Sequence, residues 1–190
     1  MSGTVTRLDA RPSDADLVSR ARVGDRSAME ALFRRHAAMA QGVAFRLLGR
    51  DSDLEDVVHE AFMTAFARLD RLERAESFPG WLATIVTGTV IDMIRRRRFL
   101  SRLGILGVEP IQLERIASPS APPDVISELR AVYGLIDRLP TEERVVLVLR
   151  RVEQLKLEEI AERTGLSLAT VKRKLAKAET ALEARMGEAR

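Results

Sequence analysis

The sequence predicts an all-α fold in which two helical domains are joined by a flexible linker. Apolar residues recur every three or four positions through most of the chain, and no segment shows the alternating pattern of a β-strand. Capping residues and glycines divide the chain into helix-sized segments. After Phe99 the composition changes, because glycines and prolines interrupt any long helix. The predicted domains are residues 1–100 and 124–190, and the predicted linker is residues 101–123.

The first two helices of the N-terminal domain are predicted by their ends. One covers residues 14–23 and is followed by Gly24, and a longer one covers residues 27–48 and is followed by Gly49. Glycine readily takes the left-handed conformation that ends many helices.

A third helix is predicted to open at the capping-box pair Ser52 and Glu55 and to run to about residue 69. Its apolar face consists of Val58, Phe62, Ala65, Phe66 and Leu69. A loop at 70–77 then leads into a fourth helix over 78–99. Residues of that helix that can share an apolar face are Trp81, Ile85, Ile91 and Ile94. Four helices of this kind can close one domain.

The C-terminal domain is predicted to hold helices over residues 124–139 and 141–152, followed by a helix-turn-helix over residues 157–182. In the helix-turn-helix, Ala161 is small enough for two helices to cross closely, Gly165 suits the turn, and Ser167 can cap the second helix. The core of this unit is predicted to consist of Leu157, Ile160, Leu166, Val171, Leu175, Ala178 and Leu182.

Charge is divided unevenly between the two helices of this unit. The first carries Glu158, Glu159 and Glu162 against Arg163, whereas the second carries a basic run with no acid before Glu179. In that stretch Thr170 is followed by the basic residues Lys172, Arg173, Lys174 and Lys177. A basic second helix favours contact with duplex DNA. The alternative is an ordinary helical hairpin whose lysines form a solvated face.

Composition excludes several classes of protein. A chain of 190 residues holds one or two domains, and a hydrophobic content of 46% excludes a disordered chain. The net charge of +3 says less about DNA binding than the local distribution does. The absence of cysteine excludes disulfides, thiol nucleophiles and the usual zinc fingers. No signal peptide is recognisable, and Asp92 interrupts the longest apolar stretch, so we expect a soluble cytoplasmic protein without membrane insertion.

Enzyme chemistry finds little support in the sequence. His36 and His59 are isolated, and Met63 stands where a zinc protease motif beginning at His59 would need a histidine. No glycine loop of the phosphate-binding kind occurs. A recombinase would need a nucleophilic serine or tyrosine on a catalytic fold, and Tyr133 stands alone in a predicted helix. We therefore expect no catalytic residues, no metal site and no cofactor.

Two charged clusters lie in the N-terminal domain. Acids without an intervening base gather at the start of the third helix, namely Asp51, Asp53, Glu55, Asp56 and Glu60. This cluster favours either contact with a basic partner or simple capping and solubility. Four arginines, Arg95, Arg96, Arg97 and Arg98, end the fourth helix and suit diffuse contact with phosphates. A solvated helix end is the alternative for the arginines.

Three segments together resemble a known family. DSDLEDVVHEAFMTAFARL is similar to an acidic polymerase-binding helix, and FPGWLATIVTGTVIDMIRRRR is similar to a segment that opens and reads the minus-10 promoter element. LPTEERVVLVLRRVEQLKLEEIAERTGLSLATVKRKLAKAE looks like a minus-35 reading domain. This ordered pair of modules resembles the extracytoplasmic-function group of the sigma-70 family of bacterial RNA polymerase initiation factors, over nearly the whole chain.

The resemblance implies three sets of contacts. Contacts with core RNA polymerase fall on Asp53, Asp56, His59 and Glu60. Contacts with the minus-10 element, where the loop at 75–80 lies beside single-stranded promoter DNA, fall on Phe78, Trp81, Arg95, Arg96, Arg97 and Arg98. Contacts with the minus-35 duplex fall on Arg150, Thr170, Lys172, Arg173 and Lys177. The implied partners are core polymerase, promoter DNA and an anti-sigma factor, and polymerase supplies the chemistry.

This chain departs from the family pattern at two places. Thr87 and Gly88 stand where members commonly carry Arg-Asn, so the asparagine's role near a flipped base is missing. The family's usual Ser-Arg pair is Arg173-Lys174 here, and Ala176 replaces an aromatic that is sometimes present. The recognised promoter sequence therefore does not follow from relatives.

The main alternative is a helix-turn-helix repressor or activator whose N-terminal half serves for dimerisation or ligand binding. Such a dimer would bind a palindromic operator without polymerase. In either case the linker composition predicts two domains that tumble semi-independently in the free protein.

Overall fold

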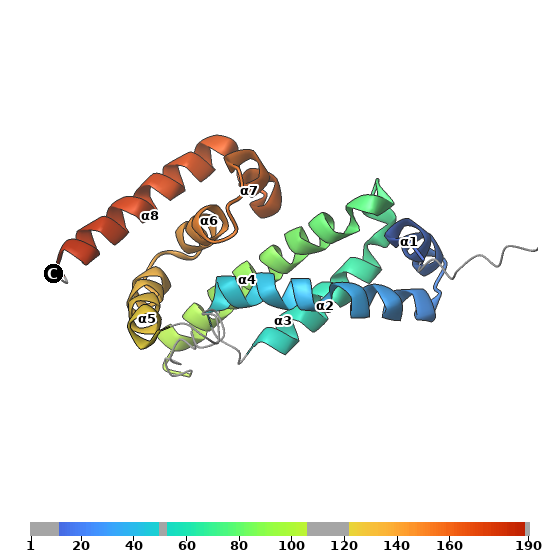
Figure 1. The fold of residues 1–190 in the computed structure, drawn as a ribbon, viewed down its shortest axis with the longest axis horizontal. Coiled ribbons are helices and arrows are strands. Elements are labelled where there is room, and N and C mark those ends of the chain that lie inside the picture. Colours follow the sequence, from blue (N-terminus) through green and yellow to red (C-terminus); the bar gives the residue numbers. More distant parts are fainter. Residues whose placement is uncertain (1–11, 50–52, 106–121, 189–190) are drawn as a thin grey trace, which may run out of the picture.

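The computed structural model describes residues 12–49, 53–105 and 122–188, and within these ranges it contains helices and no strands. The all-α fold with two helical units is therefore confirmed. Figure 1 shows the helices: α1 (Asp14–Arg22), α2 (Arg26–Leu48), α3 (Leu54–Ala67), α4 (Phe78–Arg102), α5 (Pro123–Asp137), α6 (Thr141–Arg151), α7 (Leu157–Thr164) and α8 (Leu168–Glu188). Two short 3-10 turns, η1 (Leu69–Arg71) and η2 (Ala75–Ser77), lie between α3 and α4.

The helix ends follow the chemistry expected of them. Asp25 caps α2 by accepting bonds from the backbone N–H groups of Ser27 at 2.9 Å and Ala28 at 3.2 Å. Gly49 ends α2 in the left-handed conformation at φ 66°. The predicted capping box at the start of α3 involves Ser52, which lies outside the described residues. α4 runs to Arg102, three residues further than the sequence predicts.

The N-terminal unit is built on α2, α3 and α4, which pack against one another, with α1 against α2 (Figure 1). Its core holds residues from every one of these helices, including Leu17, Leu32, Val57, Phe62 and Leu82. Arg22 fastens α1 to the segment after α3 by donating to the backbone oxygens of Leu69 and Leu72. The loop that leads into α4 is thereby held against α1.

The C-terminal unit consists of α6, α7 and α8, with α5 at one end of α8 (Figure 1). α6 is buried along most of its length, and α7 and α8 add Ile160, Val171 and Ala178 to the same core. Three of the residues expected in this core are therefore fully buried. Leu157, Leu166, Leu175 and Leu182 are partly buried against it.

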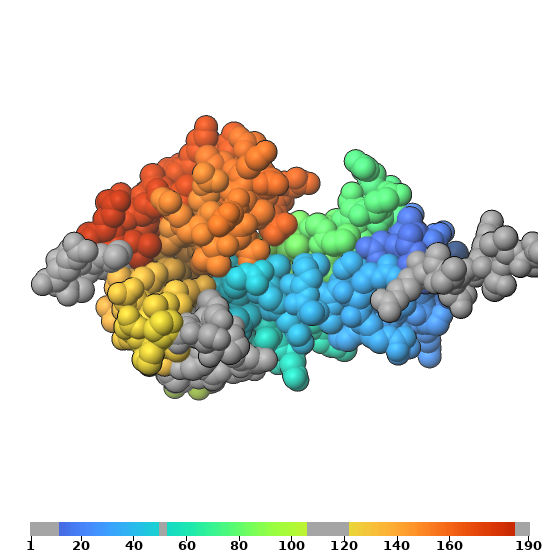
Figure 2. Space-filling model, viewed as in Figure 1, coloured from blue at the N-terminus to red at the C-terminus, as the bar shows by residue number. Residues whose placement is uncertain are grey.

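The two units pack against each other. α6 contacts both α2 and α4, and α7 contacts α4. In Figure 2 the atoms of the C-terminal unit lie directly against those of α2 and α4. This differs from the expectation of semi-independent domains, because local composition carries no information about bonds formed between distant helices. Residues 106–121 of the predicted linker lie outside the described residues, so the domain boundaries stay predictions.

Within the described ranges, the segment Ala75–Arg102 has the length and composition of a membrane span, with a mean hydropathy of 1.2 in its most apolar window. In the structure 44% of that window is buried inside the protein. The core helix of a folded domain meets the same criterion of length and composition, and α4 is the helix around which α2 and α3 pack.

The turn glycine of the helix-turn-helix gives a stability prediction. Gly165 has φ +70°, so Gly165→Ala places a Cβ in the left-handed region and should lower the free energy of unfolding by about 1 kcal/mol. Gly134 lies inside α5 with open space around its Cα, so Gly134→Ala should raise that free energy by roughly 0.5–1 kcal/mol. Urea unfolding followed by circular dichroism measures both changes. Equal effects of the two substitutions would contradict the conformational explanation.

Candidate nucleic-acid interface

The helix-turn-helix forms as its sequence predicts. Gly165 takes the left-handed conformation between α7 and α8. The Ser167 hydroxyl accepts a bond from the backbone N–H of Thr170 at 3.2 Å, which caps α8. Glu159 accepts a bond from the backbone N–H of Lys156 at 2.6 Å, at the start of α7. Both helices therefore begin at defined residues, and the direction in which α8 leaves the turn is fixed.

The residues expected on the outward side of α8 divide into two groups. Lys172, Arg173 and Lys177 are exposed, and Thr170 is half-buried with its hydroxyl 2.9 Å from that of Ser167. Lys174 instead turns toward α6, where its ammonium lies 2.8 Å from the Glu142 carboxylate. This contact with Lys174, and a second with Arg95, hold the pKa of Glu142 below its usual range. Lys174 is thus part of the protein's internal packing, and the outward basic face is smaller than the sequence suggests.

Arg150 lies on α6 rather than on the helix-turn-helix. It is exposed, and its guanidinium donates a bond to the backbone oxygen of Leu155 at 2.9 Å, just before α7 begins. A guanidinium has five N–H donors, so this bond leaves others for a phosphate. Arg150 and the outward face of α8 form what we call the duplex face: Arg150, Thr170, Lys172, Arg173 and Lys177.

The four arginines at the end of α4 point in different directions. Arg95 pairs with Glu142 of α6 at 2.6 Å, and Arg97 pairs with Asp53 at 2.6 Å. Arg98 donates to the backbone oxygens of Asp137 and Leu139 and to the Thr141 hydroxyl. Arg96 is exposed. In this arrangement Arg95, Arg97 and Arg98 bond to the protein itself, which the arginine run in the sequence does not reveal.

Phe78 and Trp81, both expected at the minus-10 element, have different surroundings. Phe78 is 0% exposed, and its ring lies 5.3 Å from His36 and 6.2 Å from Trp81 between centroids. A side chain without exposed surface does not stack on a DNA base, so Phe78 is a core residue in this structure, contrary to the expectation. Trp81 is half-buried and lines a cavity of about 460 Å³ with Ser77, Gly80 and Thr84.

The two residues that depart from the family pattern lie in the middle of α4. Thr87 is fully buried, and its hydroxyl donates a bond to the backbone oxygen of Ala83 at 2.8 Å. Gly88 is half-buried and lines a cavity of about 200 Å³ together with Thr164 and Leu166 of the helix-turn-helix. Both positions therefore belong to internal contacts in this arrangement.

The acidic face expected on α3 is only partly exposed. Asp56, His59 and Glu60 are exposed, whereas Asp53 is held by Arg97 and is half-buried. Asp53 is thus bonded within the chain in this arrangement rather than presented to a partner, because its carboxylate neutralises an arginine of α4.

Beside these acids runs an apolar groove between α2 and α3, which sequence reasoning missed. It has a volume of about 290 Å³, and its walls include Met29, Phe33, His59, Phe62, Met63 and Phe66. Phe33 is 39% exposed and Met63 is 57% exposed. A signal existed, since Met63 is an apolar residue that lies outside the apolar face predicted for this helix. We call Asp56, His59, Glu60 and this groove the α3 face.

Tyr133 lies in the core rather than at a reactive site. It is buried on α5, and burial raises the pKa of its hydroxyl. A nucleophilic tyrosine needs the opposite shift. Among the described residues, no group of three or more His, Asp or Glu side chains is placed to hold a metal ion.

Two protein-family models match the chain. Sigma-70 region 2 matches residues 32–99, and Sigma-70, region 4 matches residues 129–182. The first range contains α3 and nearly all of α4, and the second contains α6, α7 and most of α8. The matched ranges together make up more than half of the chain and carry the duplex face and, apart from Met29, the named residues of the α3 face.

Characterised relatives are similar over most of this chain. "ECF RNA polymerase sigma factor SigE" of Mycolicibacterium smegmatis is 34% identical over 159 residues, which cover 80% of this chain and 60% of that protein. "ECF RNA polymerase sigma factor SigW" of Bacillus subtilis is 26% identical over 172 residues, which cover 87% of this chain and 92% of that protein. The chain thus spans less than two thirds of the length of the first relative and nearly all of the second.

Two solved structures share the fold. The chain matches CnrH, solved in complex with the cytosolic domain of CnrY, with 25% identity and a TM-score of 0.59, over 93% of this chain and 99% of that one. It also matches the sigma factor RpoE of Bartonella quintana, solved with the anti-sigma factor NepR, with 19% identity and a TM-score of 0.63, over 85% of this chain and 98% of that one. The second similarity concerns the fold alone.

The duplex face gives a prediction about DNA binding. If Arg173 or Lys177 reads a base, its replacement by alanine should weaken DNA binding by about 1–3 kcal/mol and relax the sequence preference at one base pair. If the residue contacts a phosphate, the replacement should weaken binding to all sequences alike and reduce the slope of log affinity against log salt concentration by about one. Lys174→Ala removes the same charge from an inward position and serves as the matched control. Fluorescence anisotropy with duplex DNA at several salt concentrations makes the measurement. If Arg173→Ala, Lys177→Ala and Lys174→Ala behaved alike, α8 would not be the reading helix.

Proposed function

Because the chain belongs to the extracytoplasmic-function group of the sigma-70 family, we propose that it directs bacterial RNA polymerase to a specific set of promoters. The observation that carries the proposal is that region 2 and region 4 both match one chain, with region 2 before region 4. Region 2 carries a surface suited to docking on polymerase, and region 4 carries a surface suited to binding duplex DNA. The repressor alternative assigns the N-terminal half to dimerisation or ligand binding, whereas residues 32–99 of that half match Sigma-70 region 2.

Each of three surfaces has a separate role in the proposed initiation of transcription. The α3 face docks on core polymerase, with Asp56 and Glu60 pairing with basic side chains and the apolar groove receiving a nonpolar one. α4 and the loop before it hold the opened minus-10 strand, where Trp81 offers a ring for stacking. The duplex face anchors the minus-35 element through contacts in and beside the major groove.

The proposed mechanism is non-covalent. Polymerase forms the phosphodiester bonds, and this chain contributes binding free energy and sequence preference, so it is not itself an enzyme. Its place of action is the cytoplasm, where polymerase and chromosome meet. Since RpoE of Bartonella quintana was solved in complex with an anti-sigma factor, a protein regulator of that kind is part of the proposal for this chain too.

Charge reversal on the α3 face tests the proposal. The double substitution Asp56→Lys with Glu60→Lys should abolish comigration with core polymerase in gel filtration, because two exposed carboxylates would become like charges facing basic partner residues. Helicity should stay unchanged, since neither side chain is buried.

The matched control is Glu128→Lys with Glu183→Lys, which makes the same charge change at exposed positions of α5 and α8. Comigration should survive in this control. Unchanged comigration of the Asp56 and Glu60 variant would reject the α3 face as the docking surface. Failure of the unmodified chain to comigrate with core, together with dimeric binding to a palindromic duplex, would favour the repressor instead.

A further inference from the structure

A cavity of about 510 Å³ lies where the end of α4 meets the connection between α5 and α6. Arginines line it from both sides, namely Arg95, Arg98 and Arg102 of α4 and Arg138, which follows α5. Asp137 is the one acidic residue among those that line it. Sites for small molecules in proteins have volumes of roughly 300–1,000 Å³, so this cavity is large enough for a nucleotide.

The arginines of α4 lie along one side of that helix. Positions 95, 98 and 102 are three and four residues apart, which places their side chains one above the other over successive turns. Phe99 belongs to the same stripe, lines the cavity and is 61% exposed. A large aromatic ring therefore lies among cationic groups and in contact with water rather than in the core.

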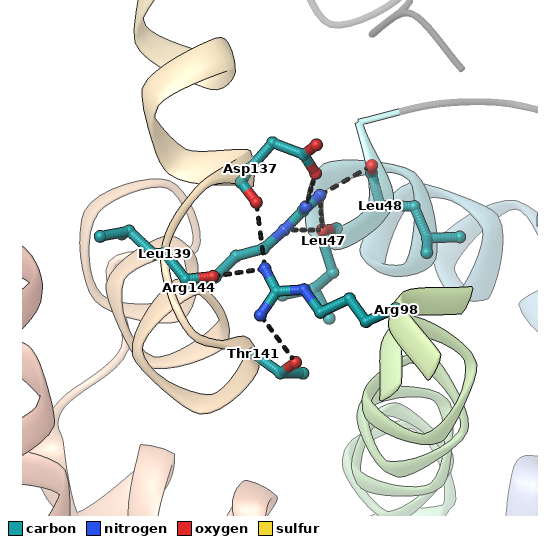
Figure 3. Close-up of polar contacts among 7 residues, drawn as sticks. All are labelled: Leu47, Leu48, Arg98, Asp137, Leu139, Thr141 and Arg144. Atoms are coloured by element: carbon teal, nitrogen blue, oxygen red, sulfur yellow. Dashed lines mark hydrogen bonds and ion pairs between the residues drawn. The ribbon is translucent and has the colours of Figure 1, made fainter. Parts of the chain in front are cut away.

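Two of the four arginines are bonded within the protein. Arg95 pairs with Glu142 at 2.6 Å. Arg98 donates to the backbone oxygen of Asp137 at 3.0 Å and to the Thr141 hydroxyl at 3.1 Å, as Figure 3 shows. These bonds join α4 to the opposite wall of the cavity.

The carboxylate in the cavity wall is also engaged. Asp137 pairs with Arg144 of α6, which is 2% exposed (Figure 3). Arg144 also donates to the backbone oxygens of Leu47 at 2.8 and 3.1 Å and of Leu48 at 2.8 Å, at the end of α2. The connection between α5 and α6 is thus held in place by its own bonds, so a ligand finds this wall already formed.

Arg102 and Arg138 differ from the other two arginines of the cavity. Both are exposed, and one belongs to each wall. Within residues 12–49, 53–105 and 122–188, neither side chain forms an ion pair or a hydrogen bond. Two such guanidinium groups on one cavity produce a positive potential that attracts a multiply charged anion. Guanidinium groups bind phosphate through pairs of parallel N–H···O bonds.

We propose that this cavity binds a free nucleoside polyphosphate, with its phosphates on Arg102 and Arg138 and its base against the ring of Phe99. Several phosphates in a row suit cationic groups on two walls, and a flat base suits an exposed aromatic ring. All three residues lie outside the set expected to contact the minus-10 element. The inference goes beyond the proposed function and does not depend on it.

Nucleotide binding by the full-length chain tests the inference. The probe is ATP that carries a fluorescent group on its ribose, followed by anisotropy, with unlabelled ATP, inorganic tripolyphosphate and adenosine as competitors. ATP should compete best because it offers both phosphates and a base, and adenosine should compete least because it has no charge. Absence of saturable ATP binding up to about 1 mM would overturn the proposal.

A double substitution tests the phosphate contacts. Arg102→Ala with Arg138→Ala should weaken ATP binding by a factor on the order of ten or more, since both charge-assisted contacts are lost. Both side chains are exposed, so circular dichroism should show unchanged helicity. The matched control, Arg34→Ala with Arg68→Ala, removes the same charge at exposed positions outside the cavity. Equal losses in the two variants would reject the site, because they would show attraction to the total charge of the chain.

Phe99→Ala separates the base from the phosphates. This substitution should weaken ATP binding several-fold and leave the binding of tripolyphosphate unchanged, because only ATP has a base to stack. An equal effect on both ligands, or no effect on either, would reject the contact between Phe99 and the base.

A nucleic-acid backbone offers the same phosphate chemistry and forms the second arm of the experiment. Random-sequence single-stranded and duplex DNA are titrated against the Arg102 and Arg138 variant. A loss of DNA affinity with unchanged ATP affinity would assign these arginines to nucleic acid and overturn the proposal. A chain that binds ATP through Arg102 and Arg138 but does not comigrate with core polymerase would reject the sigma assignment and keep the nucleotide site.

Discussion

The last carbonyls of a helix have no hydrogen-bond partners within that helix. In this protein, arginines from the opposite unit donate to such carbonyls, and the packing of the two units depends on these bonds. Arg144 completes the end of α2, and Arg98 completes the end of α5. Neither arginine lies on the helix that it completes, so each unit supplies what the other lacks. Burial of Arg144 is tolerable because its charge meets carbonyl oxygens and the Asp137 carboxylate rather than apolar atoms.

The same chemistry suits arginine to two kinds of acceptor. Carbonyl oxygens at a helix end and phosphate oxygens on DNA are both acceptors with negative charge, and arginine binds either. Arg95 and Arg98 are bonded to Glu142 and to the end of α5, so part of the donor capacity of each guanidinium is used inside the protein in this arrangement. The arginine-rich end of α4 is therefore not a fully solvated helix end, and not all of its arginine donors are available to DNA.

The features that the sequence predicts well are those that depend only on residues close to one another in the chain. Gly165 and Ser167 set the helix-turn-helix through a turn and a cap, both of which involve residues only a few positions apart. The burial of Phe78, the pairing of Lys174 with Glu142 and that of Asp53 with Arg97 depend on helices brought together by folding. Charge and type alone do not distinguish Lys174 from Lys172, so the inward member of the basic run required the structure.

Binding at the apolar groove between α2 and α3 should depend on temperature. A partner seated on Phe33 and Met63 removes apolar surface from water, and such burial lowers the heat capacity and loses strength on cooling. The arginine bonds to the ends of α2 and α5 are polar and lack this dependence on apolar hydration. Cooling therefore weakens attachment at the groove more than it weakens these bonds, so a partner held there is held less tightly in the cold while the packing of the two units changes less.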